Sequence, residues 1–125
     1  MSRWVILLTD EVRDWLAKLA AHDQETAVLV RAAIRVLSDD GPALGRPLVD
    51  TIKGSRIKNL KELRPGSSKR SEVRILFAFD PRRQAILLVA GDKSTNWKGW
   101  YRTAIQTAET LYDRHIRSIE SSLPT

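Results

Sequence analysis

The first pattern along the chain is a run of five apolar residues, 4–8 (WVILL), which ends at Thr9 and Asp10. A short run that is apolar throughout predicts a strand with both faces covered. Residues 41–56 are rich in Gly, Pro and Ser, a composition typical of a loop.

Between these two segments, apolar residues recur every three or four positions, which is the spacing of one face of a helix. The first series is Val12, Trp15, Leu16 and Leu19, and the second is Ala27, Val30, Ala33, Ile34 and Leu37. Thr9 or Asp10 is expected to cap the first helix, and Asp23 the second, because short polar side chains accept the free N–H groups of a helix start. Two helices so close in sequence predict an antiparallel hairpin, which Gly41 and Pro42 would end.

Three further strands are expected at residues 57–64, 72–79 and 84–91. In the second of them, alternation places Arg74, Leu76 and Ala78 on the face opposite Val73, Ile75, Phe77 and Phe79. The third strand is the most apolar and is expected to be central. Residues 80–83 (DPRR) predict a tight turn, and residues 65–71 (PGSSKRS) predict a basic hairpin loop.

The last pattern is again helical, with apolar residues every three or four positions over 97–121. The predicted order is therefore β–α–α–β–β–β–α. It indicates an α+β fold, a small antiparallel β-meander with the N-terminal helical hairpin packed on one face and a C-terminal helix. The other sheet face could stay open. A length of 125 residues fits a single domain, 1–125.

Charge is distributed unevenly along the chain. Residues 41–100 hold 13 basic and 5 acidic side chains, whereas residues 1–40 hold 5 basic and 7 acidic ones. The formal net charge is +6. A basic middle segment favours a polyanionic partner such as nucleic acid, although a solvated basic face would give the same composition.

The composition also excludes several kinds of site and predicts a compartment. Cys is absent and only two His are present, so disulfides and thiolate metal sites are excluded, and neither a metal nor a cofactor is expected. The apolar runs are too short for a secretory signal or a membrane span, which favours a soluble cytoplasmic protein with no membrane partner. Motifs such as GxSxG, the Walker loop, GxGxxG and HExxH do not occur.

The candidate chemistry lies in three cations near the strand ends. Arg74 stands within an apolar strand, Arg64 ends the neighbouring strand, and Lys93 follows the third strand. If the first two strands pair as a hairpin, the three side chains converge on an anion site that could hold a phosphate. The alternative is an ion pair of Arg64 or Arg74 with Glu62 or Glu72, and a plain loop position for Lys93.

Aromatic residues at the start of the last helix also allow two interpretations. Trp97, Trp100 and Tyr101 could stack on nucleobases, or they could anchor the helix to the sheet, which is the favoured interpretation. His115 falls on the apolar face of the same helix and is expected to pack there.

Three segments together resemble a known family. They are LKELRP (60–65), EVRILFAFD (72–80) and ILLVAGDKS (86–94). This order resembles the HigB branch of the RelE/ParE toxin superfamily, in particular its phage-derived HigB-like group. That family typically shows an ELR strand, a following strand with a central Arg, an apolar strand that ends near a Lys, and a helix that opens with aromatics. The resemblance covers about residues 4–116.

The resemblance implies a RelE-like fold and the toxin of a type II toxin–antitoxin system. Such a toxin would be a metal-independent, ribosome-dependent mRNA endoribonuclease that inhibits translation. The implied partners are mRNA on the ribosome and a helix-turn-helix antitoxin (HigA-like), with a toxin–antitoxin hetero-oligomer. The residues carried over as catalytic are Arg64, Arg74, Asp92 and Lys93. The expected RNA-binding residues are Lys58, Lys61, Lys69 and Arg70, which add positive charge on the first strand of the predicted meander and on the basic hairpin loop.

One departure from the family leaves alternatives open. Some members place a His in the site, but residues 41–100 contain none, so the available groups for proton transfer are Asp92, Glu62 and Tyr101. The chain could instead be a gyrase-poisoning, ParE-like toxin without nuclease activity. It could also be a catalytically inactive nucleic-acid-binding module.

Overall fold

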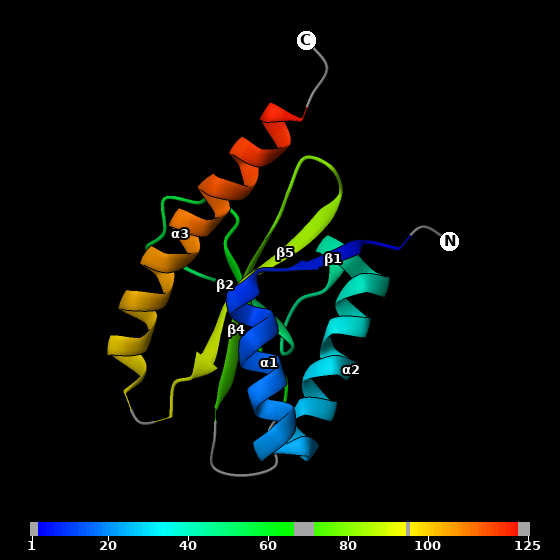
Figure 1. Ribbon diagram of the computed structural model, residues 1–125, viewed down its shortest axis with the longest axis vertical. Coiled ribbons are helices and arrows are strands. Elements are labelled where there is room, and N and C mark those ends of the chain that lie inside the picture. Colours follow the sequence, from blue (N-terminus) through cyan, green and yellow to red (C-terminus); the bar gives the residue numbers. More distant parts are fainter. Residues whose placement is uncertain (1–2, 67–71, 95, 123–125) are drawn as a thin grey trace.

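The computed structural model describes residues 3–66, 72–94 and 96–122. Its elements, in chain order, are β1 (Val5–Leu8), α1 (Asp10–His22), α2 (Gln24–Asp40), a 3-10 turn (Gly41–Ala43), β2 (Val49–Thr51), β3 (Lys61–Leu63), β4 (Val73–Phe79), β5 (Gln84–Asp92) and α3 (Trp97–Ser121). Figure 1 shows α1 and α2 on one side of the sheet and α3 on the other.

The sheet has five strands in the order β1-β5-β4-β3-β2. Strands β2 to β5 form an antiparallel meander, and β1 adds to it in parallel beside β5. The predicted α+β class is thus confirmed, within a larger and mixed sheet. Strand β4, and not β5, is central. Strand β2 lies in a segment that the sequence predicts to be a loop.

Strand β1 lies at the edge of the sheet and packs on both of its faces. Ile6 and Leu8 pack against the core under the α1–α2 hairpin, and Leu7 packs against the core under α3. The predicted coverage of both faces is thus confirmed for these three partly buried residues, whereas Val5 is 53% exposed.

The sheet buries both of its faces. The α1–α2 hairpin packs on the face that carries Val73, Ile75 and Phe77. Helix α3 packs on the opposite face, against Leu76 and Ala78, so the expectation that this face could stay open is wrong. The alternation predicted for β4 is confirmed, and it puts Arg74 on the α3 side.

Helices α1 and α2 begin at the caps that the sequence predicts, Thr9 and Asp23. Thr9 accepts the Val12 N–H at 3.2 Å, and its hydroxyl donates to the Leu88 carbonyl at 2.9 Å. Asp23 caps α2 by accepting the Thr26 N–H at 3.2 Å. Because the Thr9 side chain bonds to β5 as well as to its own helix, it fixes where α1 begins relative to the sheet.

A β-bulge in β5 decides which side chains face α3. Leu76 pairs with Val89 and Phe77 pairs with Leu87, so Leu88 is an extra residue in the ladder. The bulge reverses the alternation beyond it. As a result Gly91 lies opposite Arg74 on the α3 side, and Lys93 follows on that same side.

Gly91 allows α3 to approach the sheet closely. A Cβ atom at this position would lie 2.3 Å from the indole nitrogen of Trp100, closer than such atoms can pack. We expect Gly91→Ala to lower the free energy of unfolding by about 1–3 kcal/mol, the usual cost of overpacking. Urea unfolding followed by circular dichroism measures this change. Gly45→Ala is the control, because a Cβ at Gly45 would meet nothing within 4 Å.

Asp80 connects the β4–β5 turn to α3. It is buried and accepts hydrogen bonds from the backbone N–H groups of Arg82 and Gln84 and from the Gln84 amide, and its carboxylate lies 2.7 Å from His115 Nε2. Burial alone would raise its pKa, but these hydrogen bonds outweigh burial and hold the pKa of Asp80 below the ordinary 3.8.

The lowered pKa of Asp80 gives an acid-dependent stability. A carboxylate with a depressed folded-state pKa contributes its full stability above pH 3.8 and loses it as the pH falls through the folded-state pKa. We expect the free energy of unfolding to fall on acidification in this range, and to fall less in Asp80→Asn. Urea titrations of both proteins at several pH values test this expectation, and equal acid slopes would contradict it.

Candidate functional site

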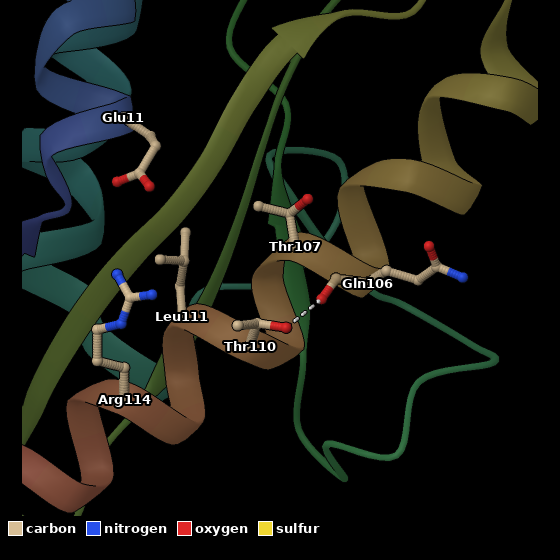
Figure 2. A pocket seen from close by; sticks show the side chains of 6 residues that line it. All are labelled: Glu11, Gln106, Thr107, Thr110, Leu111 and Arg114. Carbon is tan, nitrogen blue, oxygen red and sulfur yellow. Dashed lines mark hydrogen bonds between the residues drawn. The ribbon is translucent and has the colours of Figure 1, made fainter.

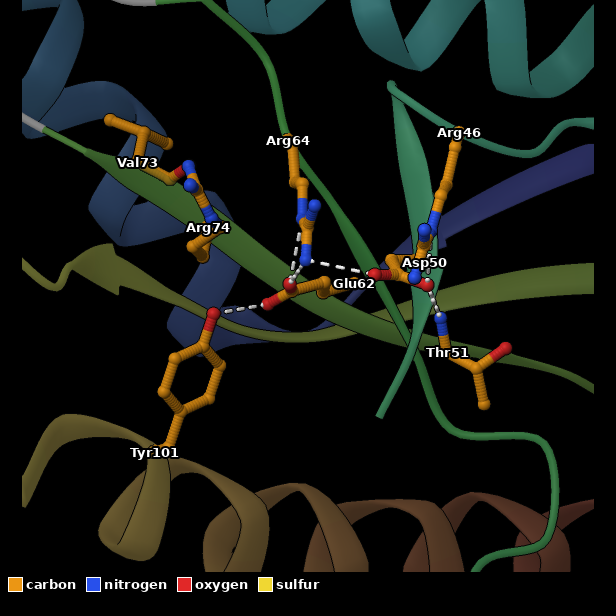
Figure 3. Close-up of polar contacts among 8 residues, drawn as sticks. All are labelled: Arg46, Asp50, Thr51, Glu62, Arg64, Val73, Arg74 and Tyr101. Carbon is orange, nitrogen blue, oxygen red and sulfur yellow. Dashed lines mark hydrogen bonds and ion pairs between the residues drawn. The ribbon is translucent and has the colours of Figure 1, made fainter. Parts of the chain in front are cut away.

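Three strand ends and the first turns of α3 meet at one end of the sheet. Arg64 follows β3, Arg74 is the second residue of β4, and Lys93 follows β5. The Lys93 N–H donates to the Glu72 carbonyl at 3.1 Å, which continues the β4–β5 pairing past Asp92. Tyr101 enters this cluster from α3 (Figure 3). The structure therefore brings the three predicted cations to the same end of the α3-facing side.

Glu62 lies at the centre of the cluster. Its side chain is only 3% exposed, although it is a carboxylate in the middle of β3. It accepts the Tyr101 hydroxyl at 2.5 Å through Oε2 and the Arg64 Nε at 2.8 Å through Oε1 (Figure 3). A buried carboxylate is stable only when its oxygens are paired in this way.

The Tyr101 hydroxyl is held in its protonated form. Burial, followed by the hydrogen bond to Glu62, raises the pKa of Tyr101 to about 12, while the Arg74 guanidinium partly offsets the shift. At neutral pH the hydroxyl therefore donates to Glu62. It also lies close enough to Arg74 for the guanidinium charge to lower its pKa.

Arg64 is neutralised by two acids. Its Nη2 lies 2.7 Å from Glu62 Oε1 and 3.0 Å from Asp50 Oδ2. Partial burial works against the charged form, but the hydrogen bond with Glu62 prevails and raises the pKa of Arg64. The ion-pair interpretation of Arg64 is thus confirmed. Asp50, which pairs opposite Glu62 on β2, was not expected at the site.

Arg74 differs from Arg64 in having no acidic partner. Its Nη1 donates to the Val73 carbonyl at 2.8 Å, and its buried Nε has no hydrogen-bond partner. Within residues 3–66, 72–94 and 96–122, no carboxylate lies within 4.0 Å of Arg74, so the proposed pair with Glu72 does not form. The charge of this guanidinium remains available to an anion.

Lys93 lies against the aromatic residues of α3. Its Nζ is 5.4 Å from the Tyr101 ring centroid and 5.9 Å from that of Trp97. Both distances are within the range of cation–π attraction. Like Arg74, Lys93 forms no ion pair in the part of the chain that the structure describes.

The Asp92 side chain accepts hydrogen bonds from the backbone. Its Oδ1 accepts the N–H groups of Glu72 and Ser94, each at 2.9 Å. Burial would raise its pKa, but these backbone hydrogen bonds outweigh burial and lower the pKa of Asp92. A carboxylate with a lowered pKa is a weak proton acceptor, so the geometry favours a role in shaping the end of β5.

The predicted RNA-binding lysines are not gathered at this cluster. Lys61 shares the α1–α2 side of β3 with Leu63, opposite the side of Glu62. Lys58 lines a pocket with Arg56 and Asp113, further along α3. Lys69 and Arg70 lie outside the described residues.

The two tryptophans of α3 have different environments. Trp100 is partly buried and packs over Gly91, which confirms helix anchoring for this residue. Trp97 is 55% exposed and contacts Tyr101 edge-on, with 6.4 Å between ring centroids.

Another hollow lies away from the cluster. Figure 2 shows a pocket between α1 and α3, lined by Glu11, Leu111 and Arg114 among others. An adjoining pocket shares these three residues and extends to His115. Arg74, Tyr101 and Lys93 line neither pocket.

In the described part of the chain, no group of three His, Asp or Glu side chains is arranged to hold a metal ion. None of the described helices is both long and apolar enough for a membrane span.

Sequence reasoning did not select Asp50 for the site and left Tyr101 and Glu62 as unassigned candidates. For Glu62 a signal exists, because a carboxylate at an inward position of a strand requires a partner. For Asp50 no signal exists, since its strand was not recognised.

The comparisons with known proteins identify the family. The model of the family "Phage derived protein Gp49-like (DUF891)" matches residues 14–113, so the chain belongs to this family. The chain is 55% identical over 115 residues to "Putative toxin HigB2" of Mycobacterium tuberculosis (strain ATCC 25618 / H37Rv), which covers 92% of this chain and 56% of that relative. It is 45% identical over 113 residues to "Putative toxin HigB3" of the same strain, which covers 90% of this chain and 94% of that relative. This chain thus spans little more than half of the first relative and nearly all of the second. The resemblance to HigB-like toxins is confirmed.

Proposed function

We propose that this protein is the toxin of a type II toxin–antitoxin system and that it inhibits translation by cutting mRNA on the ribosome. The names of its two mycobacterial relatives support the toxin assignment. The observation that carries the cleavage proposal is Arg74, a cation without an acidic partner that stands beside the Glu62–Tyr101 pair.

RNA supplies its own nucleophile, the 2′-hydroxyl next to the scissile phosphate. Its attack forms the O2′–P bond and breaks the P–O5′ bond, leaving a cyclic phosphate and a free 5′-hydroxyl. A protein that promotes this step has to align the backbone, stabilise charge on the phosphoryl oxygens, and move two protons. No metal or cofactor enters this proposal.

Each residue of the cluster has a role in this proposal. Arg74 and Lys93 hold the phosphoryl oxygens, because neither is engaged with an acid in the described structure. The Lys93 ammonium also donates a proton to O5′ as the P–O5′ bond breaks, which gives the free 5′-hydroxyl. Arg64 acts through Glu62, which it holds in place. The Tyr101 hydroxyl accepts the proton of the 2′-hydroxyl as it passes its own to Glu62, so no free phenolate is needed. Asp92 fixes the end of β5 and the position of Lys93.

The partner in this proposal is a helix-turn-helix antitoxin that forms a hetero-oligomer with the toxin. We expect an adjacent reading frame to encode such an antitoxin. Co-expression of that reading frame should restore growth, and the two proteins should co-purify.

The experiment is a translation extract given the purified protein and a defined mRNA, followed by mapping of the 5′ ends. The expected result is new ends inside the translated frame that disappear when ribosomes are removed or when translation is blocked. Intact mRNA at protein concentrations that stop translation would contradict cleavage. DNA breaks in growing cells without new mRNA ends would instead point to a gyrase poison.

A further inference from the structure

Trp97 is the one large aromatic side chain in the described residues that is left mostly in solvent. It is 55% exposed, whereas Trp4 and Trp15 pack in the protein and Trp100 packs over Gly91. The indole is the largest apolar side chain, so its exposure leaves surface that an apolar or aromatic ligand could cover. Helix anchoring, the favoured interpretation from the sequence, does not explain this residue.

The groups around Trp97 are cationic. Lys93 Nζ lies 5.9 Å from the Trp97 ring centroid, and Lys98 Nζ lies 5.7 Å from it. An exposed aromatic ring with two ammonium groups near it suits a ligand that presents a flat ring next to a negative charge. Single-stranded nucleic acid has this chemistry, because each base is joined to a phosphate.

Trp97 also borders the proposed catalytic cluster. Its ring meets the Tyr101 ring edge-on at 80°, and Lys93 lies over both rings. Tyr101 in turn donates to Glu62 and interacts electrostatically with Arg74. A strand whose phosphate is held by Arg74 and Lys93 would therefore bring a neighbouring base within reach of the exposed indole.

We propose that Trp97 is a binding residue that stacks on a nucleobase of the single-stranded RNA next to the scissile phosphate. This inference rests on the proposed function, since it takes the RNA to be the strand held by Arg74. Stacking tolerates every base, because every base has a flat π-face. Trp97 would thus strengthen binding and set the register of the strand without strong sequence preference.

The other class of occupant is a protein partner. The exposed apolar residues of α2 (Val28, Leu29 and Val36) belong to a helix on the other side of the sheet from Trp97. With Lys93 and Lys98 beside the indole, the charge favours a polyanion.

The test measures binding of Trp97→Ala and Trp97→Phe to a short single-stranded RNA with 2′-O-methyl groups at every position, which removes the nucleophile. Loss of one stacked base should weaken binding about tenfold in Trp97→Ala, and less in Trp97→Phe, which keeps a ring. Fluorescence anisotropy of a labelled RNA gives the Kd. Val28→Ala is the matched control, because it shortens an exposed apolar side chain on α2 and should leave the Kd unchanged.

A second readout separates stacking from a structural role. In ribosome-dependent cleavage, Trp97→Ala should raise the concentration of ribosome–mRNA complex needed for half-maximal rate, with a nearly unchanged rate at saturation. Equal Kd values for Trp97→Ala and wild type, or no RNA binding by the wild type, would overturn the inference. Loss of antitoxin binding with RNA binding intact would also overturn it and identify a protein surface. Absence of cleavage by the wild type tests the proposed function separately, since the Kd comparison does not depend on turnover.

Discussion

Replacing Arg74 with Ala is expected to lower the rate of mRNA cleavage by about 100-fold or more, the usual cost of removing a group that stabilises transition-state charge. The same change should alter the free energy of unfolding by no more than about 1.5 kcal/mol, the net value of one ordinary hydrogen bond. The structure gives the reason for this difference. In the described residues the guanidinium donates to the Val73 carbonyl and interacts with the Tyr101 hydroxyl but pairs with no carboxylate, so its removal leaves no acid unpaired.

Arg74→Lys distinguishes charge from geometry. Lys keeps the positive charge but cannot donate two parallel hydrogen bonds to a phosphate, so an intermediate rate is expected. Arg31→Ala is the control, because Arg31 is an exposed residue of α2 on the other side of the sheet. The assay is ribosome-dependent cleavage of a defined mRNA, with urea unfolding of each variant. Wild-type cleavage by Arg74→Ala would contradict the proposed role of this residue.

Much of the fold could be predicted from the sequence because local patterns determine it. The two helical periods, the caps at Thr9 and Asp23, and the alternation within β4 each rest on residues close together in the chain. The edge position of β1 could not be predicted, because an apolar run has the same composition at an edge as inside a sheet. Strand β2 was missed because three residues with one buried side chain give no period.

The convergence of Arg64, Arg74 and Lys93 was predicted from strand pairing, but its electrostatic detail was not. Without the bulge at Leu88, simple alternation would direct Lys93 to the α1–α2 side of the sheet, and no residue type marks that bulge. The pairing of Arg64 with Asp50 depends on β2. The sequence therefore located the basic cluster and could not tell that Arg64 is neutralised while Arg74 is not.

Replacing Glu62 with Ala is expected to lower the free energy of unfolding by about 3–5 kcal/mol, the cost of breaking a buried pair from one side. Two partners lose their acceptor, the Tyr101 hydroxyl and the Arg64 guanidinium. Because Asp50 still faces Arg64, the lower end of this range is expected. Glu62→Gln keeps an acceptor oxygen but not the charge, so its loss should be intermediate. Urea unfolding of the wild type and both variants measures these losses, provided that the free energy of unfolding depends on urea concentration with the same slope in all three proteins.

Asp39→Ala is the matched control, since it also removes a carboxylate from an ion pair with an arginine. The Arg3–Asp39 pair has a distance of 3.2 Å, but its side chains are 74% and 47% exposed, so its loss should cost less than about 1 kcal/mol. Equal losses in Asp39→Ala and Glu62→Ala would mean that Glu62 does not hold the cluster together. If instead Glu62→Ala loses both stability and cleavage activity while Arg74→Ala loses only cleavage activity, the two residues have different roles. The buried acid then organises the site, and the arginine without an acidic partner binds the phosphate.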